Sequence, residues 1–254
     1  MKRDNHMKKI VALTLCVILA AVFVTGCVSI NYSGTAGGGV TGRGSMETIT
    51  IPVGVITEVR VELLCNIEYF SSPSDTATFQ IQSNLMEYIN IEENEGILTV
   101  RSTRNINVSG TANTPVLTVY APLLTRVNHA GAGNFTANDP IKVNDFTLGI
   151  AGAANAVAEL DVQNLTITLA GAGKIDLSGT ADTANISIAG AGTLDALDLE
   201  TRVTSIDLAG VGSVRIGCSE KLSVTAGGVG SVEYRGSPTL DLTRGGLVTV
   251  TQVS

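Results

Sequence analysis

Apolar and polar side chains alternate along much of the chain from residue 49 onward, which is the pattern of strands with one buried face. The stretches ITIPVGVITEVRVELLCNIEYF (residues 49–70), TATFQIQ (76–82) and LTVRS (98–102) show it, with turn-forming residues between them. Residues 84–93, NLMEYINIEE, fit either a short helical turn or another strand. The pattern predicts an all-β domain over residues 46–254, with an irregular β lead-in at 46–115.

A repeat begins in the second half of the chain, at residues 116–254. Glycine motifs of the type AGAG recur there. We call the residue two positions before the first glycine of each motif its anchor, and this residue is apolar except in the first copy. The spacings between anchors are 21, 19, 19, 20 and 18 residues, and TRGG at 243–246 is a last, degenerate copy. The anchors are His129, Ile150, Leu169, Ile188, Leu208 and Ala226. A second apolar column follows the glycines, at Phe135, Ala156, Ile175, Leu194, Val214 and Val232.

The length of this repeat selects the architecture. A βαβ unit needs roughly 30 residues, so a period near 19 is too short for one. It suits one turn of a parallel β-helix, in which successive turns stack about 4.8 Å apart and bury a shared core that no single turn could bury alone. We therefore predict a single-stranded parallel β-helix, or solenoid, with rungs of about 19 residues.

The glycine motifs could bind a ligand or turn the chain. A calcium-binding β-roll has a period of nine and an Asp where this chain has Ile175 and Leu194. A phosphate-binding loop needs a third Gly or a Lys-Ser/Thr pair, followed by a helix, and the AGAG motifs have neither. Gly37, Gly39 and Gly42 match the dinucleotide-binding pattern G-x-G-x-x-G, but no strand pattern precedes them and no helix pattern follows. Glycine permits sharp corners and close backbone approach, so we interpret the motifs as corners. The predicted corner glycines are Gly131, Gly133, Gly152, Gly171, Gly173, Gly190, Gly192, Gly210, Gly212, Gly228 and Gly230.

One outward column carries charge and is the candidate binding surface. It contains Thr136, Val157, Asp176, Asp195, Arg215 and Glu233. Stacked rungs would pair Asp195 with Arg215 and Arg215 with Glu233. Asp176 beside Asp195 would be repulsive unless Lys174 or a bound cation offsets the charge. The interpretation that weighs more is a row of solvated charges.

The N-terminus has the features of an export signal. Lys8 and Lys9 precede VALTLCVILAAVFVTG (residues 11–26), and VTGC ends at Cys27. This arrangement resembles a bacterial lipobox, which predicts a signal peptide at 1–26, a lipidated Cys27 and a flexible tether at 27–45. The alternative is a transmembrane anchor, for which the stretch is short. We expect a cell-envelope protein that is attached to a membrane through its lipid and faces out of the cytoplasm.

Charge and chemistry narrow the function further. Removing residues 1–26 takes away four of the 16 basic and one of the 23 acidic side chains, which leaves a net charge of −10. An acidic protein is repelled by nucleic acid, so nucleic acid is disfavoured as a partner.

Cys65 and Cys218 could form a disulfide after export, or each could be a small buried hydrophobe. His129 occupies an anchor position, so we expect a structural role for it. The basic residues are scattered and no catalytic motif occurs, so we predict no enzyme, cofactor or metal site.

The export signal, the lead-in, VLTVYAPLLTRVNHAGAGNF (residues 116–135) and the serial glycine motifs together resemble the auto-transporter adhesin head GIN domain family. The resemblance covers roughly residues 48–249, and APLLTRVNHAGAG is its most specific part. It implies a right-handed β-helical domain at the cell surface and supplies no catalytic residues. No C-terminal membrane barrel follows Ser254, so we expect lipid anchoring rather than autotransport.

The sequence thus favours a non-enzymatic envelope lipoprotein that presents a β-solenoid for adhesion or scaffolding. Its partner would be an extracellular protein or a glycan. One alternative is a carbohydrate-active β-helix protein that binds or cleaves polysaccharide. Another is a sensor or regulator of envelope stress.

Overall fold

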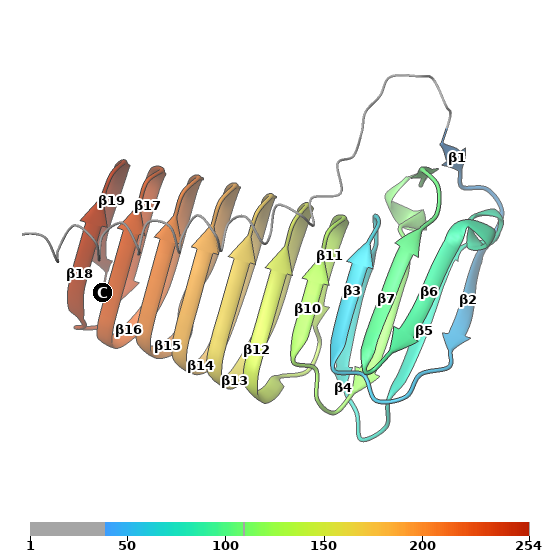
Figure 1. Ribbon diagram of the computed structural model, residues 1–254, viewed down its shortest axis with the longest axis horizontal. Helices are drawn as coiled ribbons and strands as arrows, with labels where there is room; N and C mark the ends of the chain where they lie inside the picture. Colours follow the sequence, from blue (N-terminus) through green and yellow to red (C-terminus); the bar gives the residue numbers. More distant parts are fainter. Residues whose placement is uncertain (1–38, 109, 254) are drawn as a thin grey trace, which may run out of the picture. The chain divides into compact units, whose positions relative to one another are not determined.

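The computed structural model describes residues 39–108 and 110–253 of the chain. The predicted signal peptide, Cys27 and most of the predicted tether lie outside these residues. Strands make up 72% of the structure, and they stack in parallel at a spacing of about 19 residues into a solenoid of about seven turns (Figure 1). The predicted fold class is therefore confirmed, while the right-handed sense stays a prediction.

Parallel strands build the solenoid, and each long strand is bent so that it forms most of one turn. They are β10 (Arg126–His129), β11 (Ala132–Ala137), β12 (Ile141–Ile150), β13 (Ala153–Leu169), β14 (Ala172–Ile188), β15 (Ala191–Leu208), β16 (Val211–Ala226), β17 (Val229–Arg235), β18 (Thr239–Arg244) and β19 (Leu247–Val253).

The anchor residues stack on one another as the repeat predicts. His129 pairs in register with Ile150, and Ile150 with Leu169. The series continues through Ile188, Leu208 and Ala226, and all six side chains are buried. The second apolar column, from Phe135 to Val232, stacks and is buried in the same way. Each fully buried Val, Ile or Leu contributes about 1.5–3 kcal/mol, so these columns supply the stability that a lone turn lacks.

Each turn has two bends. The first lies at the glycine motif, where the amide of Ala172 donates to the carbonyl oxygen of Gly152 at 2.9 Å. A Cβ on Gly171 would overlap that same carbonyl oxygen, so close approach of the backbones is what requires glycine there. Among the predicted corner glycines, all of which the structure describes, Gly133 is the one with a positive φ, at 132°.

The second bend interrupts the alternation of buried and exposed residues. In β13 the alternation runs from Ala153 to Val162, breaks at the two exposed residues Gln163 and Asn164, and resumes at Leu165. The same break recurs in β15, at residues 202–203, and in β12, at residues 144–145. β14 and β15 contain a further break, at residues 178–180 and 197–198, where their registers with the neighbouring turns also shift.

The lead-in contributes a turn of its own, out of chain order. β3 (Glu58–Glu62) and β4 (Asn66–Ser71) pair with β10 and β11 on one side. On the other side they pair with β7 (Ile97–Ser102) and β9 (Val116–Ala121). In Figure 1 the cyan β3 accordingly lies between the green β7 and the yellow-green β10. The rungs thus include residues 58–71, whereas the sequence predicted them from residue 116 onward.

Antiparallel strands close the N-terminal end of the solenoid. β5 (Thr76–Gln82) pairs antiparallel with β9 and with β2 (Met46–Ile51), and β6 (Ile89–Asn94) pairs antiparallel with β7. Between β5 and β6, the 3-10 helix η1 (Ser83–Tyr88) places Leu85 in the core. Residues 84–93 are thus a helical turn followed by a strand. The cap covers the parallel edge that β7 and β9 would otherwise expose.

Two short elements complete the described chain. β1 (Val40–Thr41) pairs with β8 (Ile106–Asn107) in a separate small sheet, and η2 (Thr111–Asn113) is a second 3-10 helix. Val40 packs against the core. The folded part therefore starts within the segment that the sequence analysis predicted to be tether.

Candidate functional site

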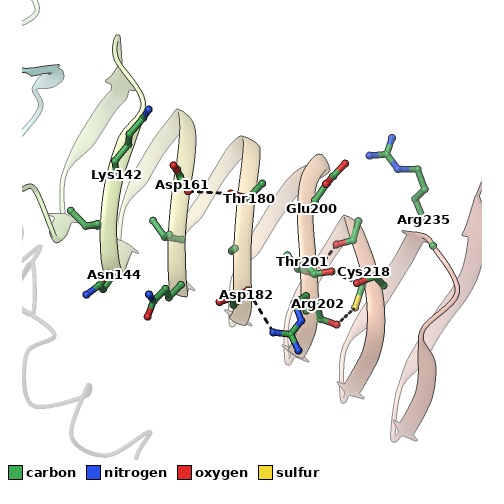
Figure 2. Close-up of a pocket in the computed structure, with 17 residues that line it drawn as sticks. Lys142, Asn144, Asp161, Thr180, Asp182, Glu200, Thr201, Arg202, Cys218 and Arg235 are labelled. Atoms are coloured by element: carbon green, nitrogen blue, oxygen red, sulfur yellow. Dashed lines mark hydrogen bonds and ion pairs between the residues drawn. The ribbon is translucent and has the colours of Figure 1, made fainter.

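The second bend of the turns forms a groove with a volume of about 800 Å³ that crosses six strands, from β12 to β17 (Figure 2). Stacked turns repeat about every 4.8 Å, so the groove runs for roughly 24 Å at right angles to the strands. Its two walls are the outward residues on either side of one inward position, as the alternation of a strand requires.

Three columns of residues line the groove, one from each position around the bend. The first rim contains Lys142, Asp161, Thr180, Glu200, Gly217 and Arg235, which follow one another in register. The floor contains Val143, Val162, Ala181, Thr201 and Cys218. The second rim contains Asn144, Gln163, Asp182, Arg202 and Ser219.

Hydrogen bonds hold the floor in place where it is polar. The hydroxyl of Thr201 donates to the carbonyl oxygen of Gly217 at 2.7 Å and accepts from Thr204, 2.6 Å away. The thiol of Cys218 donates to the carbonyl oxygen of Lys221 at 3.2 Å. Thr201 and Cys218 are each 3% exposed, so the floor is a closed surface.

Some charged groups of the rims already have partners. The guanidinium of Arg202 donates to Glu220 at 2.8 Å and lies 3.7 Å from Asp182. The hydrogen bond from Arg202 lowers the pKa of the Glu220 carboxyl below its ordinary value. Asp161 accepts a hydrogen bond from the hydroxyl of Thr180 at 3.4 Å.

Other rim groups are free to bind a ligand. Within the part of the chain that the structure describes, the side chains of Lys142, Asn144, Gln163 and Glu200 make no hydrogen bond or ion pair. All four are exposed at the groove. They offer one ammonium, two amides and one carboxylate, which can both donate and accept hydrogen bonds.

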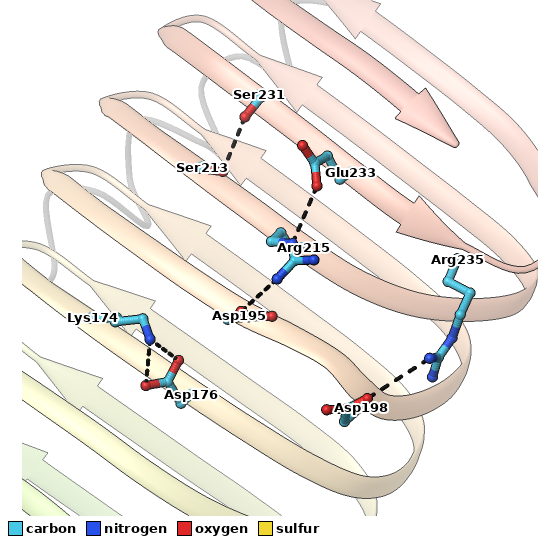
Figure 3. Close-up of polar contacts among 9 residues, drawn as sticks. All are labelled: Lys174, Asp176, Asp195, Asp198, Ser213, Arg215, Ser231, Glu233 and Arg235. Carbon is cyan, nitrogen blue, oxygen red and sulfur yellow. Dashed lines mark hydrogen bonds and ion pairs between the residues drawn. The ribbon is translucent and has the colours of Figure 1, made fainter. Parts of the chain in front are cut away.

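A bulge shapes the groove near β15. The register between β15 and β16 shifts between Ala196 and Glu200, so β15 carries extra residues at the rim. Arg235 reaches across Gly217, which has no side chain, and donates to the carbonyl oxygen of Leu197 at 2.6 Å. Its guanidinium also lies 3.8 Å from Asp198 (Figure 3).

The charged column predicted from the sequence lies outside the groove (Figure 3). Arg215 lies between two carboxylates, 2.7 Å from Asp195 and 3.2 Å from Glu233. Asp176 and Asp195 are neighbours in register, but Asp176 pairs within its own strand with Lys174, at 2.7 Å. Each of these charges is paired with another, so the column offers a ligand fewer free groups than the groove does.

The histidine and cysteines identified in the sequence are packed into the core. His129 is 1% exposed, its burial lowers its pKa, and its Nε2 lies 2.9 Å from the carbonyl oxygen of Cys65. Burial raises the pKa of Cys65 to about 12. Cys65 and Cys218 are both buried and free, in turns that several others separate, so the structure contains no bridge between these two residues.

Residues 39–108 and 110–253 hold no cluster of three His, Cys, Asp or Glu side chains placed to ligate a metal ion. They also include no helix with the length and apolar character needed to span a bilayer.

Sequence reasoning missed the groove. The available signal was the pair of consecutive exposed residues, such as Gln163–Asn164, which breaks the alternation at equivalent places in β12, β13 and β15. The fold and the groove define the chain as a parallel β-solenoid with an open polar surface channel.

Comparison with known proteins places this solenoid in a family. Residues 56–238 match the family described as "Putative auto-transporter adhesin, head GIN domain", and the chain belongs to it. Membership of an adhesin family indicates a protein of the cell surface or envelope. A search among curated proteins finds no match.

Solved structures share the fold. A putative adhesin from Bacteroides fragilis NCTC 9343 superposes with a TM-score of 0.79 at 22% identity, covering 85% of this chain and 100% of that one. A putative lipid binding protein from Parabacteroides distasonis ATCC 8503 gives 0.68 at 21% identity, with coverages of 85% and 100%. A putative adhesin from Parabacteroides merdae ATCC 43184 gives 0.65 at 24% identity, with coverages of 85% and 99%.

Proposed function

We propose that the protein is a non-enzymatic envelope lipoprotein that presents its solenoid for adhesion, with the groove along β12–β17 as its contact surface. The observation that carries this proposal is the groove itself, a channel of about 800 Å³ with free polar side chains on both rims. The adhesin family to which the chain belongs supports the same function.

Cys218 and His129 are not placed for catalysis in the groove. Cys218 lies in its floor, but the thiol is buried and donates to a backbone carbonyl. His129 is buried in the core of another turn and does not line the groove. Catalysis by either group would need it at the surface that receives the substrate. The carboxylates of Asp161, Asp182 and Glu200 do line the groove and are exposed, so a product assay on polysaccharides separates binding from cleavage.

Lipid anchoring through Cys27 completes the proposal. The VTGC motif precedes the solenoid by a short Gly- and Ser-rich stretch, which would hold the domain just outside a membrane. Metabolic labelling with palmitate tests it directly. Wild type should incorporate label and fractionate with membranes, whereas Cys27→Ala should incorporate none.

Adhesion is tested on whole cells. Cells that display the full-length chain should attach to a target cell layer or matrix, and surface protease should abolish attachment. Purified chain should release no product from a panel of polysaccharides. Absence of the protein from the surface of intact cells would overturn the adhesin proposal, and release of sugar products would show a carbohydrate-active enzyme instead.

A further inference from the structure

We infer that the ligand of the groove is a neutral linear glycan that lies along the solenoid axis and is recognised by side-chain hydrogen bonds. This inference rests on the proposed adhesive function and names the class of ligand that the groove fits. The direction of the groove, its charge and its free side chains carry the inference.

The direction of the groove disfavours a peptide bound by strand addition. A peptide that extends a sheet needs free backbone N–H and C=O groups at a strand edge. The groove instead runs across strands β12–β17, whose backbones pair with the neighbouring turns. A ligand in the groove must therefore bind side chains, and a peptide backbone would have few partners for its own amides.

The charge of the groove disfavours a polyelectrolyte. Its rims carry Lys142, Arg202 and Arg235 against Asp161, Asp182 and Glu200, so their formal charges cancel. Both signs also occur along the axis, because the acidic Asp161 and Glu200 lie between the basic Lys142 and Arg235 on the first rim. A uniform polyanion or polycation would meet repulsion along its length, whereas a neutral chain would not.

The free side chains match hydroxyl groups. A sugar hydroxyl both donates and accepts, as do the amides of Asn144 and Gln163. The carboxylate of Glu200 accepts from hydroxyls and the ammonium of Lys142 donates to them. These groups belong to β12, β13 and β15, so a polymer with hydroxyls along its whole length could contact all of them.

The test compares variants in two assays. The full-length chain, solubilised in detergent, is titrated with neutral cello-, xylo-, manno- and malto-hexaoses, with polygalacturonate and with chitosan oligomers. The same chain, displayed on cells, is scored for attachment to its target surface. The groove variants are Gln163→Ala and Glu200→Ala, and the matched control is Asn185→Ala, which removes an exposed amide outside the groove.

The inference predicts binding of at least one neutral hexaose and about tenfold weaker binding in each groove variant, because each loses a ligand hydrogen bond. Asn185→Ala should bind as wild type does. Preference for a charged polymer would overturn the neutral-glycan inference.

The cell assay separates this inference from the proposed function. Attachment could depend on Gln163 and Glu200, survive glycosidase treatment of the target surface and be lost when that surface is treated with protease. That result would support adhesion through the groove and would overturn the inference that the ligand is a glycan. Attachment unaffected by either groove variant would overturn the groove as the site. Failure of wild type to attach would overturn the proposed function itself.

Discussion

His129 and Cys65 lie in adjacent turns, and the Nε2–H of His129 donates to the carbonyl oxygen of Cys65 at 2.9 Å. The other ring nitrogen, Nδ1, is buried and has no hydrogen-bond partner among the described residues. Burial removes water from around the ring and so penalises the charged imidazolium, which lowers the pKa of His129.

Acid should destabilise the solenoid through this residue. Because the pKa of His129 is lower in the folded chain than the ordinary 6.5, the unfolded chain binds the proton more readily. The contribution of neutral His129 to the free energy of unfolding is complete above pH 6.5 and is lost as the pH falls from there through the pKa of the folded chain. His129→Leu places at this position the side chain that Leu169 supplies in the same column. Urea unfolding at about pH 7.5 and 5.5 should show a smaller loss of stability in the variant, and equal losses would contradict the assignment.

The corner glycines should tolerate no side chain. A Cβ on Gly171 would overlap the carbonyl oxygen of Gly152, so Gly171→Ala should cost about 1–3 kcal/mol of unfolding free energy. The matched control is Ala172→Val, since Ala172 points to solvent and Val211 occupies the equivalent position in β16. Its effect should stay within about 0.5 kcal/mol in the same urea titration. A cost for the control as large as that for Gly171→Ala would refute close backbone approach as the reason for glycine.

Replacing Arg215 should change stability little. Arg215 pairs with Asp195 and Glu233, but its side chain is 39% exposed. Exposed ion pairs contribute little to stability and are screened by salt, so Arg215→Gln should lower the unfolding free energy only slightly, and by less in 1 M NaCl. A larger, salt-independent loss in thermal or urea unfolding would assign the column a structural role.

Arg244 should keep the C-terminal end of the solenoid from associating. It stands in register with Ala226, at the inward-facing anchor position, on the exposed strand β18. A charge at an inward edge position disfavours pairing with another chain. Arg244→Leu should therefore form dimers or larger species in analytical ultracentrifugation, while the outward Thr243→Leu stays as wild type. Equal sedimentation of the two variants would contradict this role.

Cys65 and Cys218 should resist modification in the folded protein. Both are buried, and the pKa of Cys65, raised to about 12, leaves almost no thiolate at neutral pH. In the folded protein, mass spectrometry should find both cysteines unmodified by iodoacetamide. After unfolding in the absence of reductant, it should find both cysteines alkylated. A population that needs reductant would show a disulfide.

The repeat could be predicted from the sequence because burial imposes it locally. Each anchor from Ile150 to Ala226 stacks on an equivalent residue about nineteen positions away, so the period and the apolar columns are visible in the chain itself. The turn formed by β3 and β4 was not predictable in the same way. Leu63 and Cys65 stand at its corner in place of the glycine motif, and its neighbours β7 and β9 follow later in the chain.

The candidate site was predicted less well, for a related reason. The column of Asp195, Arg215 and Glu233 follows from the repeat, and its contacts occur as the register dictates. The groove depends on how the chain bends near Gln163. Two consecutive exposed residues in a sequence do not distinguish a bend that lines a groove from a solvated turn.

The most direct test of the central claim is to block the groove sterically. A cysteine introduced by Gln163→Cys and modified with a bulky maleimide would fill the groove, and the buried Cys65 and Cys218 should not react. Val157→Cys places the same adduct on an exposed position of β13 outside the groove. The groove account predicts that modification at position 163 abolishes attachment of displaying cells while modification at 157 leaves it unchanged. Equal attachment of both modified chains would contradict the account.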